Sequence, residues 1–277
     1  MKVKAEFHCH TTASDGRLSP SQVVELAKEK SVKLLAITDH DTTEGIEEAL
    51  NRGKELGVNI IPGIELSCLH NGESVHILGY FKGEGYKNSE LLTYLSSLKK
   101  SRLERATLMV ENLEKYFDLK VDLNRVLELG EGVVARPHLA QAIIEAGYNY
   151  DWNYIFDKFI SKNSPAYVEN KRISISEGIN FLKKHDCIVI LAHPKLIKKS
   201  PVKEFLSYGF DGLEAIYFQN FKRETDELIS LCRRNNLLIT CGSDFHGILS
   251  GDTKHGILGD MSIDEEYFNR FLHRYNS

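Results

Sequence analysis

Histidine and carboxylate side chains recur in this sequence where short apolar segments end. They fall in seven short polar segments that together hold six of the chain's 11 histidines. Imidazole and carboxylate groups are ligands for zinc, manganese and iron, and such ions generate hydroxide near neutral pH. The pattern therefore predicts a hydrolytic metal centre assembled from distant parts of the chain. Its candidate ligands are His8, His10, Asp15, His40, Glu65, His76, His193, Asp244 and His246.

Two pairs of these candidates are separated by a single residue. In extended backbone, residues i and i+2 project to the same side. His8 and His10 can therefore bind one ion, and Asp244 and His246 can face one pocket. Cys9 lies between the first pair and is expected to point away from them, into packing.

A third pair is related by a turn. Asn71-Gly72 is a strong signal for a two-residue β-hairpin turn. Pairing across that turn sets Glu65 opposite Leu78, so His76 becomes a diagonal neighbour of Glu65 on the same sheet face. If the turn has two residues, Glu65 and His76 can share a metal.

Each candidate also has an ordinary structural interpretation. A single histidine at a strand end, such as His193, is more often a hydrogen-bonded core or surface residue. Asp39 and Asp41 can cap the next helix or orient His40, so we leave both out of the ligand set. The prediction depends on the combination, because burying so many unpaired polar groups without a metal would be costly.

The elements that must position these residues alternate between strand and helix. Helix starts are marked by capping boxes at Ser19 with Gln22 and at Ser174 with Glu177. Strands are expected at residues 2–8, 33–38, 58–65, 187–192, 212–216 and 237–241. Alternation of this kind implies a mostly parallel sheet covered by helices. Polar residues at the carboxyl ends of so many strands favour a closed or nearly closed barrel with the site at that end.

The alternation is interrupted between residues 83 and 167. This segment is helical in pattern, and it begins with a long charged stretch at residues 91–116. We interpret it as a helical insertion. The expected domains are a barrel formed by residues 1–82 and 168–277 and an insertion of residues 83–167.

Composition and charge indicate the compartment of the protein and the kinds of partner it binds. The net charge of −4 argues against general electrostatic binding to nucleic acid. The five cysteines contain no CxxC pair, which favours a reducing compartment. No signal peptide and no membrane-spanning run are evident. We therefore expect a cytoplasmic protein with no obligate protein partner.

The combined motifs resemble those of the PHP family, named for its polymerase and histidinol phosphatase members. The resemblance covers nearly the whole chain and implies a distorted (β/α)7 barrel with two or three divalent ions, Mn, Fe or Zn. Carried over by position, it implies three ligand sets. They are His8, His10, Glu65 and Asp244; then Glu65, His76 and His193; then Asp15, His40 and His246.

The motifs at residues 12–16 and 135–138, together with the insertion, resemble a narrower branch of that family. Its members are nucleotide phosphatases and RNA 5′-end exonucleases. The resemblance implies that Arg136 and His138 contact phosphate and take part in catalysis, which suits the bidentate guanidinium of arginine. The alternative is an ordinary ion pair for Arg136 and a first-turn position for His138. Lys195 could bind a second phosphate or lie on a loop.

The resulting hypothesis is a phosphoesterase that hydrolyses nucleotide monoesters, of the AMP or nucleoside 3′,5′-bisphosphate type, through a metal-bridged hydroxide. One alternative is a 5′→3′ exoribonuclease acting on short RNA, for which Tyr148, Tyr150, Trp152 and Tyr154 could stack bases, although Trp152 and its neighbours more often fill a core. Another is a histidinol-phosphate phosphatase. A non-enzyme alternative is a metal-stabilised accessory module of a larger assembly.

Overall fold

The structure of the protein is a computed structural model that describes residues 1–130, 134–169, 172–248 and 253–277. The chain divides into two compact units. The first comprises Met1–Leu92 and Arg172–Ser277, and the second comprises Thr93–Lys171. Every candidate metal ligand belongs to the first unit.

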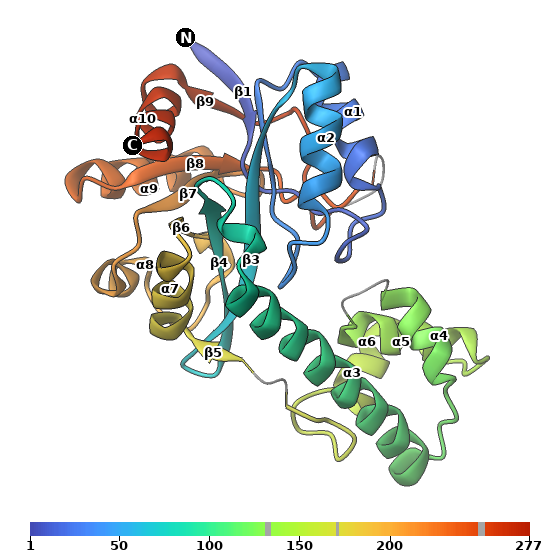
Figure 1. Ribbon diagram of the computed structural model, residues 1–277. Coiled ribbons are helices and arrows are strands. Elements are labelled where there is room, and N and C mark those ends of the chain that lie inside the picture. The colour runs from blue at the N-terminus through green and yellow to red at the C-terminus, as the bar shows by residue number, and fades with distance from the viewer. Residues whose placement is uncertain (131–133, 170–171, 249–252) are drawn as a thin grey trace. The chain divides into compact units, whose positions relative to one another are not determined.

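In the described part of the chain, nine strands form one sheet in the first unit (Figure 1). Its order is β8-β7-β6-β4-β3-β2-β1-β9, and β5 pairs with β3. The strands are β1 (Lys2–Glu6), β2 (Leu34–Ile37), β3 (Asn59–His70), β4 (Glu73–Phe81), β5 (Ile173–Ser174), β6 (Cys187–Leu191), β7 (Gly212–Tyr217), β8 (Leu238–Gly242) and β9 (Ser262–Asp264).

The sheet curls until its first and eighth strands meet. The Phe7 amide, just beyond β1, donates to the Cys241 carbonyl of β8 at 3.0 Å, and Cys9 bridges to Phe245 in parallel. Most neighbouring strands run parallel, but β4 is antiparallel to both β3 and β6. The predicted distorted α/β barrel is confirmed, and β4 is the main departure from simple strand–helix alternation.

The β3–β4 hairpin has the predicted turn and register. Asn71 and Gly72 have φ of 48° and 69°, the left-handed conformation that a type I′ turn requires. Glu65 pairs with Leu78 as the sequence predicted. The third strand is longer than predicted, since β3 continues past Glu65 to His70. This extension lets the hairpin present both Glu65 and His76 from paired strands.

Helices cover the barrel, and α1 lies beside α2 while α10 lies beside β8 and β9 (Figure 1). Both predicted capping boxes form, at Ser19 and at Ser174. The helices are α1 (Pro20–Glu29), α2 (Ile46–Leu56), η1 (Gly85–Lys87), α7 (Ile175–Lys184), η3 (Pro194–Leu196), α8 (Val202–Phe205), η4 (Leu206–Tyr208), α9 (Lys222–Arg234) and α10 (Glu265–Asn276).

Aromatic packing fills the barrel beneath the candidate site. Phe7, Tyr80 and Phe271 are fully buried and meet edge to face, with the Phe7 and Phe271 ring centroids 4.7 Å apart. The Tyr80 hydroxyl donates to the Phe7 carbonyl at 2.8 Å, which satisfies the one polar atom of that ring. This core fixes the end of β1 where the first two histidines follow.

The second unit is helical, and none of the described helices in either unit is long and apolar enough to cross a membrane. A core that includes Met109, Leu113, Leu139 and Ile143 holds the unit together. Residues 152–159 form a short α-helix that continues as a π-helix. The helical elements are α3 (Ser89–Phe117), which begins in the first unit, α4 (Leu123–Gly130), α5 (Arg136–Glu145), α6 (Trp152–Tyr154) and the π-helix η2 (Ile155–Phe159).

Candidate metal centre

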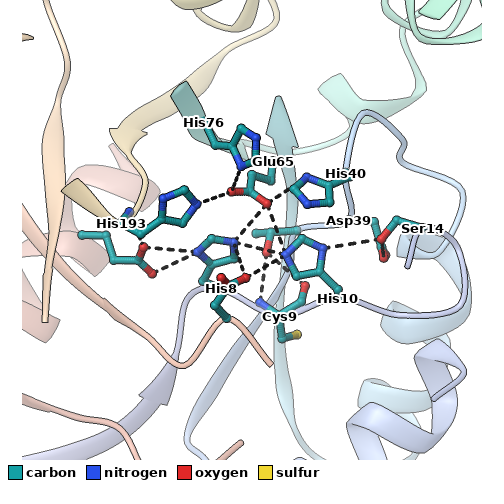
Figure 2. Close-up of polar contacts among 12 residues, drawn as sticks. His8, Cys9, His10, Ser14, Asp39, His40, Glu65, His76 and His193 are labelled. Atoms are coloured by element: carbon teal, nitrogen blue, oxygen red, sulfur yellow. Dashed lines mark hydrogen bonds and ion pairs between the residues drawn. The ribbon is translucent and has the colours of Figure 1, made fainter. Parts of the chain in front are cut away.

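The candidate ligands come together at one end of the barrel. His8 and His10 follow β1, His40 follows β2, and Asp244 follows β8. Parallel strands bring their carboxyl ends to a single edge, and Figure 2 shows these histidines pointing toward Glu65 of β3. All nine side chains named from the sequence take part in contacts with one another, so the structure disperses none of them.

The deepest group contains His8, His10, Glu65 and Asp244, all of them buried. One potential ligand atom from each lies within 4.8 Å of the others. The Nε2 atoms of both histidines are 3.2 Å from Glu65 Oε2, and His10 Nε2 is 3.2 Å from Asp244 Oδ1. The geometry matches a four-ligand cation site.

A second group lies around the other oxygen of the Glu65 carboxylate. His40, Glu65 and His76 have ligand atoms within 4.8 Å of one another. Glu65 Oε1 is 2.9 Å from both His76 Nδ1 and His193 Nε2. The Glu65 carboxylate thus faces His8, His10 and His40 with Oε2, and it faces His76 and His193 with Oε1.

The third group contains His10, Asp15, His40 and His246. His246 Nε2 lies 3.4 Å from Asp15 Oδ1, and His40 Nε2 lies 3.8 Å from Asp15 Oδ2. Asp15 is the most exposed of the three acids of the centre, with 27% of its side chain accessible to solvent. This group therefore forms the outer side of the centre.

The orientation of the polar atoms tests whether this centre fits a cation. Three imidazole nitrogens, from His8, His10 and His40, lie within 3.2 Å of Glu65 Oε2. Yet that oxygen is buried and has no hydrogen bond of acceptable geometry. The Nε2 atoms of His8 and His10 also face each other at 3.2 Å. A buried carboxylate oxygen that three imidazole nitrogens surround without a hydrogen bond fits a site for a positively charged ion.

The pKa shifts in the centre agree with that interpretation. Burial alone would raise the pKa of Glu65, but the charges of His40 and His8 hold it well below its ordinary value. Burial and His40 would lower the pKa of His10, but hydrogen bonds to Asp244 and Glu65 raise it to about 9. The carboxylates of the centre therefore favour positive charge among them.

Two buried acids beneath the centre were not found by sequence analysis. Glu214 of β7 accepts a hydrogen bond from His8 Nδ1 at 3.1 Å and from the His193 amide at 2.7 Å. Glu6 of β1 accepts from the Ser243 hydroxyl at 2.6 Å and from the His8 amide at 3.2 Å. Burial raises the pKa of Glu6 to about 8. The available signal for Glu214 was a charged residue inside the apolar strand β7, whereas Glu6 ends a strand that also contains Lys2 and Lys4 and gave no such signal.

Asp39 organises the loop that carries Asp15. Its carboxylate accepts hydrogen bonds from the Thr11 amide at 2.7 Å, the Thr11 hydroxyl at 2.8 Å and the Ser14 hydroxyl at 2.6 Å. The two roles considered from the sequence were a helix cap and an orienting partner for His40. The observed role is different, because Asp39 fixes the turn between His10 and Asp15.

Backbone strain also occurs at the centre. His193 and Asp244 have φ of 27° and 54°, in the left-handed region that side chains other than glycine seldom adopt. The Glu214 bond to the His193 amide and the Glu6 bonds to Ser243 hold these two strained positions. The buried acids therefore position ligands as well as compensate charge.

Two of the three candidate phosphate-binding residues belong to the second unit. Arg136 and His138 belong to α5 in the second unit, where the Ala135 amide donates to His138 Nδ1 at 3.1 Å. The Arg136 guanidinium lies 5.6 Å from the Phe156 ring centroid and donates to the Ile160 carbonyl at 3.3 Å.

Lys195 and the tyrosines have partners within the units that carry them. Lys195, in the first unit, pairs with both oxygens of Glu224. Tyr150 and Tyr154, in the second unit, stack on each other with centroids 5.2 Å apart.

Comparison with known proteins identifies relatives across nearly the full chain. The PHP domain family model matches residues 6–170. A 5′-3′ exoribonuclease from Haemophilus influenzae is 32% identical over 253 residues, covering 89% of this chain and 91% of the relative. A 3′,5′-nucleoside bisphosphate phosphatase from Chromobacterium violaceum is 27% identical over 267 residues, covering 92% of each chain.

Solved structures share the fold. A proposed metal-dependent phosphoesterase from Bifidobacterium adolescentis superposes with a TM-score of 0.78 and 28% identity, covering 97% of this chain and 95% of the other. An amidohydrolase from Chromobacterium violaceum has a TM-score of 0.80 at 24% identity, covering 99% and 97%. The second likeness concerns the fold alone.

Proposed function

The chain belongs to the PHP domain family and is a metal-dependent phosphoester hydrolase, and we propose that its substrates are phosphate esters of nucleotides. One observation supports the metal-dependent chemistry on which this proposal rests. The Glu65 carboxylate is approached on both oxygens by imidazole nitrogens of converging histidines. A carboxylate in this position suits a bridge between two cations.

We propose three ligand sets for two or three ions of Mn, Fe or Zn. The histidine and carboxylate donors suit all three metals, and metal availability often decides among them. When bound, such ions polarise phosphate oxygens and supply hydroxide near neutral pH. The sets are His8, His10, Glu65 and Asp244; Glu65, His76 and His193; and Asp15, His40 and His246.

The residues around these sets prepare the ligands for that chemistry. His8 donates a hydrogen bond from Nδ1 to Glu214, which leaves the lone pair of Nε2 directed into the centre. The buried position of His8, His10 and Glu65 excludes water from the side opposite the substrate. Their geometry is therefore set before a substrate arrives.

We further propose that the helical insertion, residues 83–167, contributes phosphate contacts through Arg136 and His138. Two N–H groups of the Arg136 guanidinium would donate parallel hydrogen bonds to two phosphate oxygens. The Ala135 amide donates to His138 Nδ1, so a neutral His138 carries its proton on Nε2. That N–H would donate a hydrogen bond to the leaving oxygen, and the proton that this oxygen takes up would come from water, because neutral imidazole is too weak an acid to supply it. Lys195 would reach a second phosphate only by exchanging its partner Glu224.

A second candidate, 5′→3′ exoribonuclease activity on short RNA, is favoured by the 32% identity to a relative of that name. A substrate panel with added Mn separates the alternatives. It contains AMP, adenosine 3′,5′-bisphosphate, histidinol phosphate and a short 5′-phosphorylated RNA. The absence of phosphate or nucleotide release from every member would contradict the proposal and favour an accessory module. The five buried free thiols support a cytoplasmic location.

Ligand removal tests the centre itself. We expect His10→Ala or Asp244→Ala to lower turnover by at least about 100-fold, since residues that merely orient metal ligands already contribute about 10- to 100-fold. His273→Ala, at an exposed position of α10, is the matched control. Steady-state rates and elemental analysis give the readouts. Full activity in either ligand variant would refute the ligand assignment.

A further inference from the structure

A groove on the first unit lies between the turn that follows β6 and helix α9. It has a volume of about 1180 Å³, and its walls come from η3, α8 and α9. Pro194, at one end of the groove, directly follows the candidate ligand His193. Apart from Lys195, no residue that lines this groove has a part in the proposed chemistry at the metal centre, so its composition needs a separate explanation.

The charge of the groove is opposite to that of the protein. Six lysine and arginine residues line it against three aspartate and glutamate residues, an excess of three positive charges. The whole chain has a net charge of −4. A local cationic surface on an acidic protein indicates an anionic ligand. The positive residues are Lys195, Lys198, Lys203, Lys222, Arg223 and Arg234.

Phe221 stands beside this groove with its ring in solvent. Its exposed fraction is 74%, and its chain neighbours Asn220 and Lys222 line the groove. The Lys195 ammonium lies 4.6 Å from the ring centroid. Exposed aromatic rings next to cations are the usual platform on which proteins stack bases of single-stranded nucleic acid.

Glu224 holds this platform in place. Its Oε2 accepts a hydrogen bond from the Phe221 amide at 2.8 Å, and the same carboxylate pairs with Lys195. The backbone of Phe221 and the ammonium of Lys195 are therefore both held by Glu224, in the first turn of α9. Lys198 adds a second cation, because its ammonium donates to the Lys195 carbonyl at 2.9 Å.

The loops that carry the groove also border the metal centre. Tyr217, four residues before Phe221, donates its hydroxyl to Asp244 Oδ2 at 3.2 Å. Lys195 is two residues from His193, whose Nε2 is 2.9 Å from Glu65. A chain whose terminal phosphate lies at the metal centre would thus meet the groove next.

We propose that this groove binds the nucleotides that follow the 5′ end of a single-stranded nucleic acid. A base stacks on Phe221, and backbone phosphates lie near Lys195, Lys198 and Lys222. The inference rests on the proposed function and deepens it, because it selects an oligonucleotide over a mononucleotide as the preferred substrate.

Binding and turnover together test the inference. The probe is a short 5′-phosphorylated RNA with a 3′ fluorophore, and its equilibrium binding is measured by fluorescence anisotropy in the full chain. Loss of one base stack is worth about 1–3 kcal/mol, so Phe221→Ala should raise the Kd roughly 10-fold. Lys198→Glu should weaken binding similarly and reduce its salt dependence. Phe221→Trp should retain binding.

A matched control is Lys54→Glu, which makes the same charge change at an exposed position of α2 and should leave the Kd unaltered. In turnover, the ratio of kcat/KM for the RNA to kcat/KM for AMP should fall about 10-fold in Phe221→Ala. If both groove variants bind and cleave RNA as Lys54→Glu does, the groove inference is overturned and the phosphoesterase proposal stands. If RNA binds through the groove while no nucleotide substrate is hydrolysed, the proposed function fails instead.

Discussion

His8 has buried carboxylates at its backbone amide and at both of its ring nitrogens. Its Nδ1 donates to Glu214 at 3.1 Å, its amide donates to Glu6 at 3.2 Å, and its Nε2 faces Glu65 at 3.2 Å. The hydrogen bond to Glu214 therefore places the ring proton on Nδ1 and sets the orientation of the ring. Residues behind a metal ligand can determine its affinity as strongly as the ligand itself.

Glu214→Gln tests this positioning role. We expect metal affinity to fall about 10- to 100-fold, since an amide cannot accept from both His8 Nδ1 and the His193 amide as a carboxylate does. Isothermal titration with Mn gives the affinity, and circular dichroism shows whether the fold is kept. Unchanged affinity in a folded variant would assign Glu214 a packing role only.

Sequence analysis found the nine candidate ligands but not the two acids that hold them. The candidates could be found because each follows or interrupts an apolar segment at a strand end, where a polar residue has few packing roles. Glu214 lies inside its strand, and its partner His8 is 206 residues away. No local pattern reports such a pairing. That the nine side chains bind metal remains a prediction.

At the scale of elements, the end of β8 fits closely against the centre. A Cβ at Gly242 would overlap the Glu214 carboxylate and lie 2.6 Å from the His8 Cβ. Glycine is therefore required at this position by the close approach of three strands, which the sequence pattern alone does not reveal.

Gly242→Ala should displace Glu214 and with it His8. We expect a loss of about 2 kcal/mol or more in the free energy of unfolding, together with weaker Mn binding. Gly57→Ala, at the left-handed end of α2 where a Cβ would meet nothing within 4 Å, should cost about 1 kcal/mol without changing metal affinity. Denaturant titration and calorimetry distinguish the two variants. Equal effects on metal binding would show that Gly242 acts through general stability.

Helix α5 carries the residues for which a phosphate role rests on resemblance. If Arg136 binds substrate, Arg136→Ala should raise KM roughly 10- to 100-fold with little change in kcat, as expected for a lost charge-assisted hydrogen bond. Arg125→Ala removes an arginine of the same unit that pairs with Glu145, and it serves as the control. A fall in thermal stability without a change in KM would indicate that Arg136 only packs on Phe156.

Some features of the fold can be predicted from residues that are close together in the sequence. The hairpin at Asn71-Gly72 and both capping boxes follow from residues close together in the chain, and all three form as predicted. The antiparallel placement of β4 between β3 and β6 and the short strand β9 depend on contacts between distant segments. Periodicity within a segment carries no information about such partners.

For the whole molecule, the centre should couple metal binding to stability. Buried carboxylates and imidazoles converge at this centre, so ions that bind them in the folded state must stabilise that state. At 100-fold excess over Kd, each site should contribute about 2.7 kcal/mol. Differential scanning calorimetry should therefore show a higher Tm with Mn than with a chelator, by several degrees.

The control for that experiment is His10→Ala, which should show a much smaller shift because His10 belongs to two of the three ligand groups. An identical Tm for the wild-type protein with Mn and with chelator would contradict a metal site in this centre.

The contact between β1 and β8 determines when the metal centre can be completed during synthesis of the chain. Glu6 and Ser243 form a hydrogen bond although 237 residues separate them. Ribosomes synthesise a polypeptide from its N-terminus, so His8 and His10 emerge long before Asp244 is made. A nascent chain therefore has no complete ligand set until β8 and the residues that follow it have been made and have docked against β1.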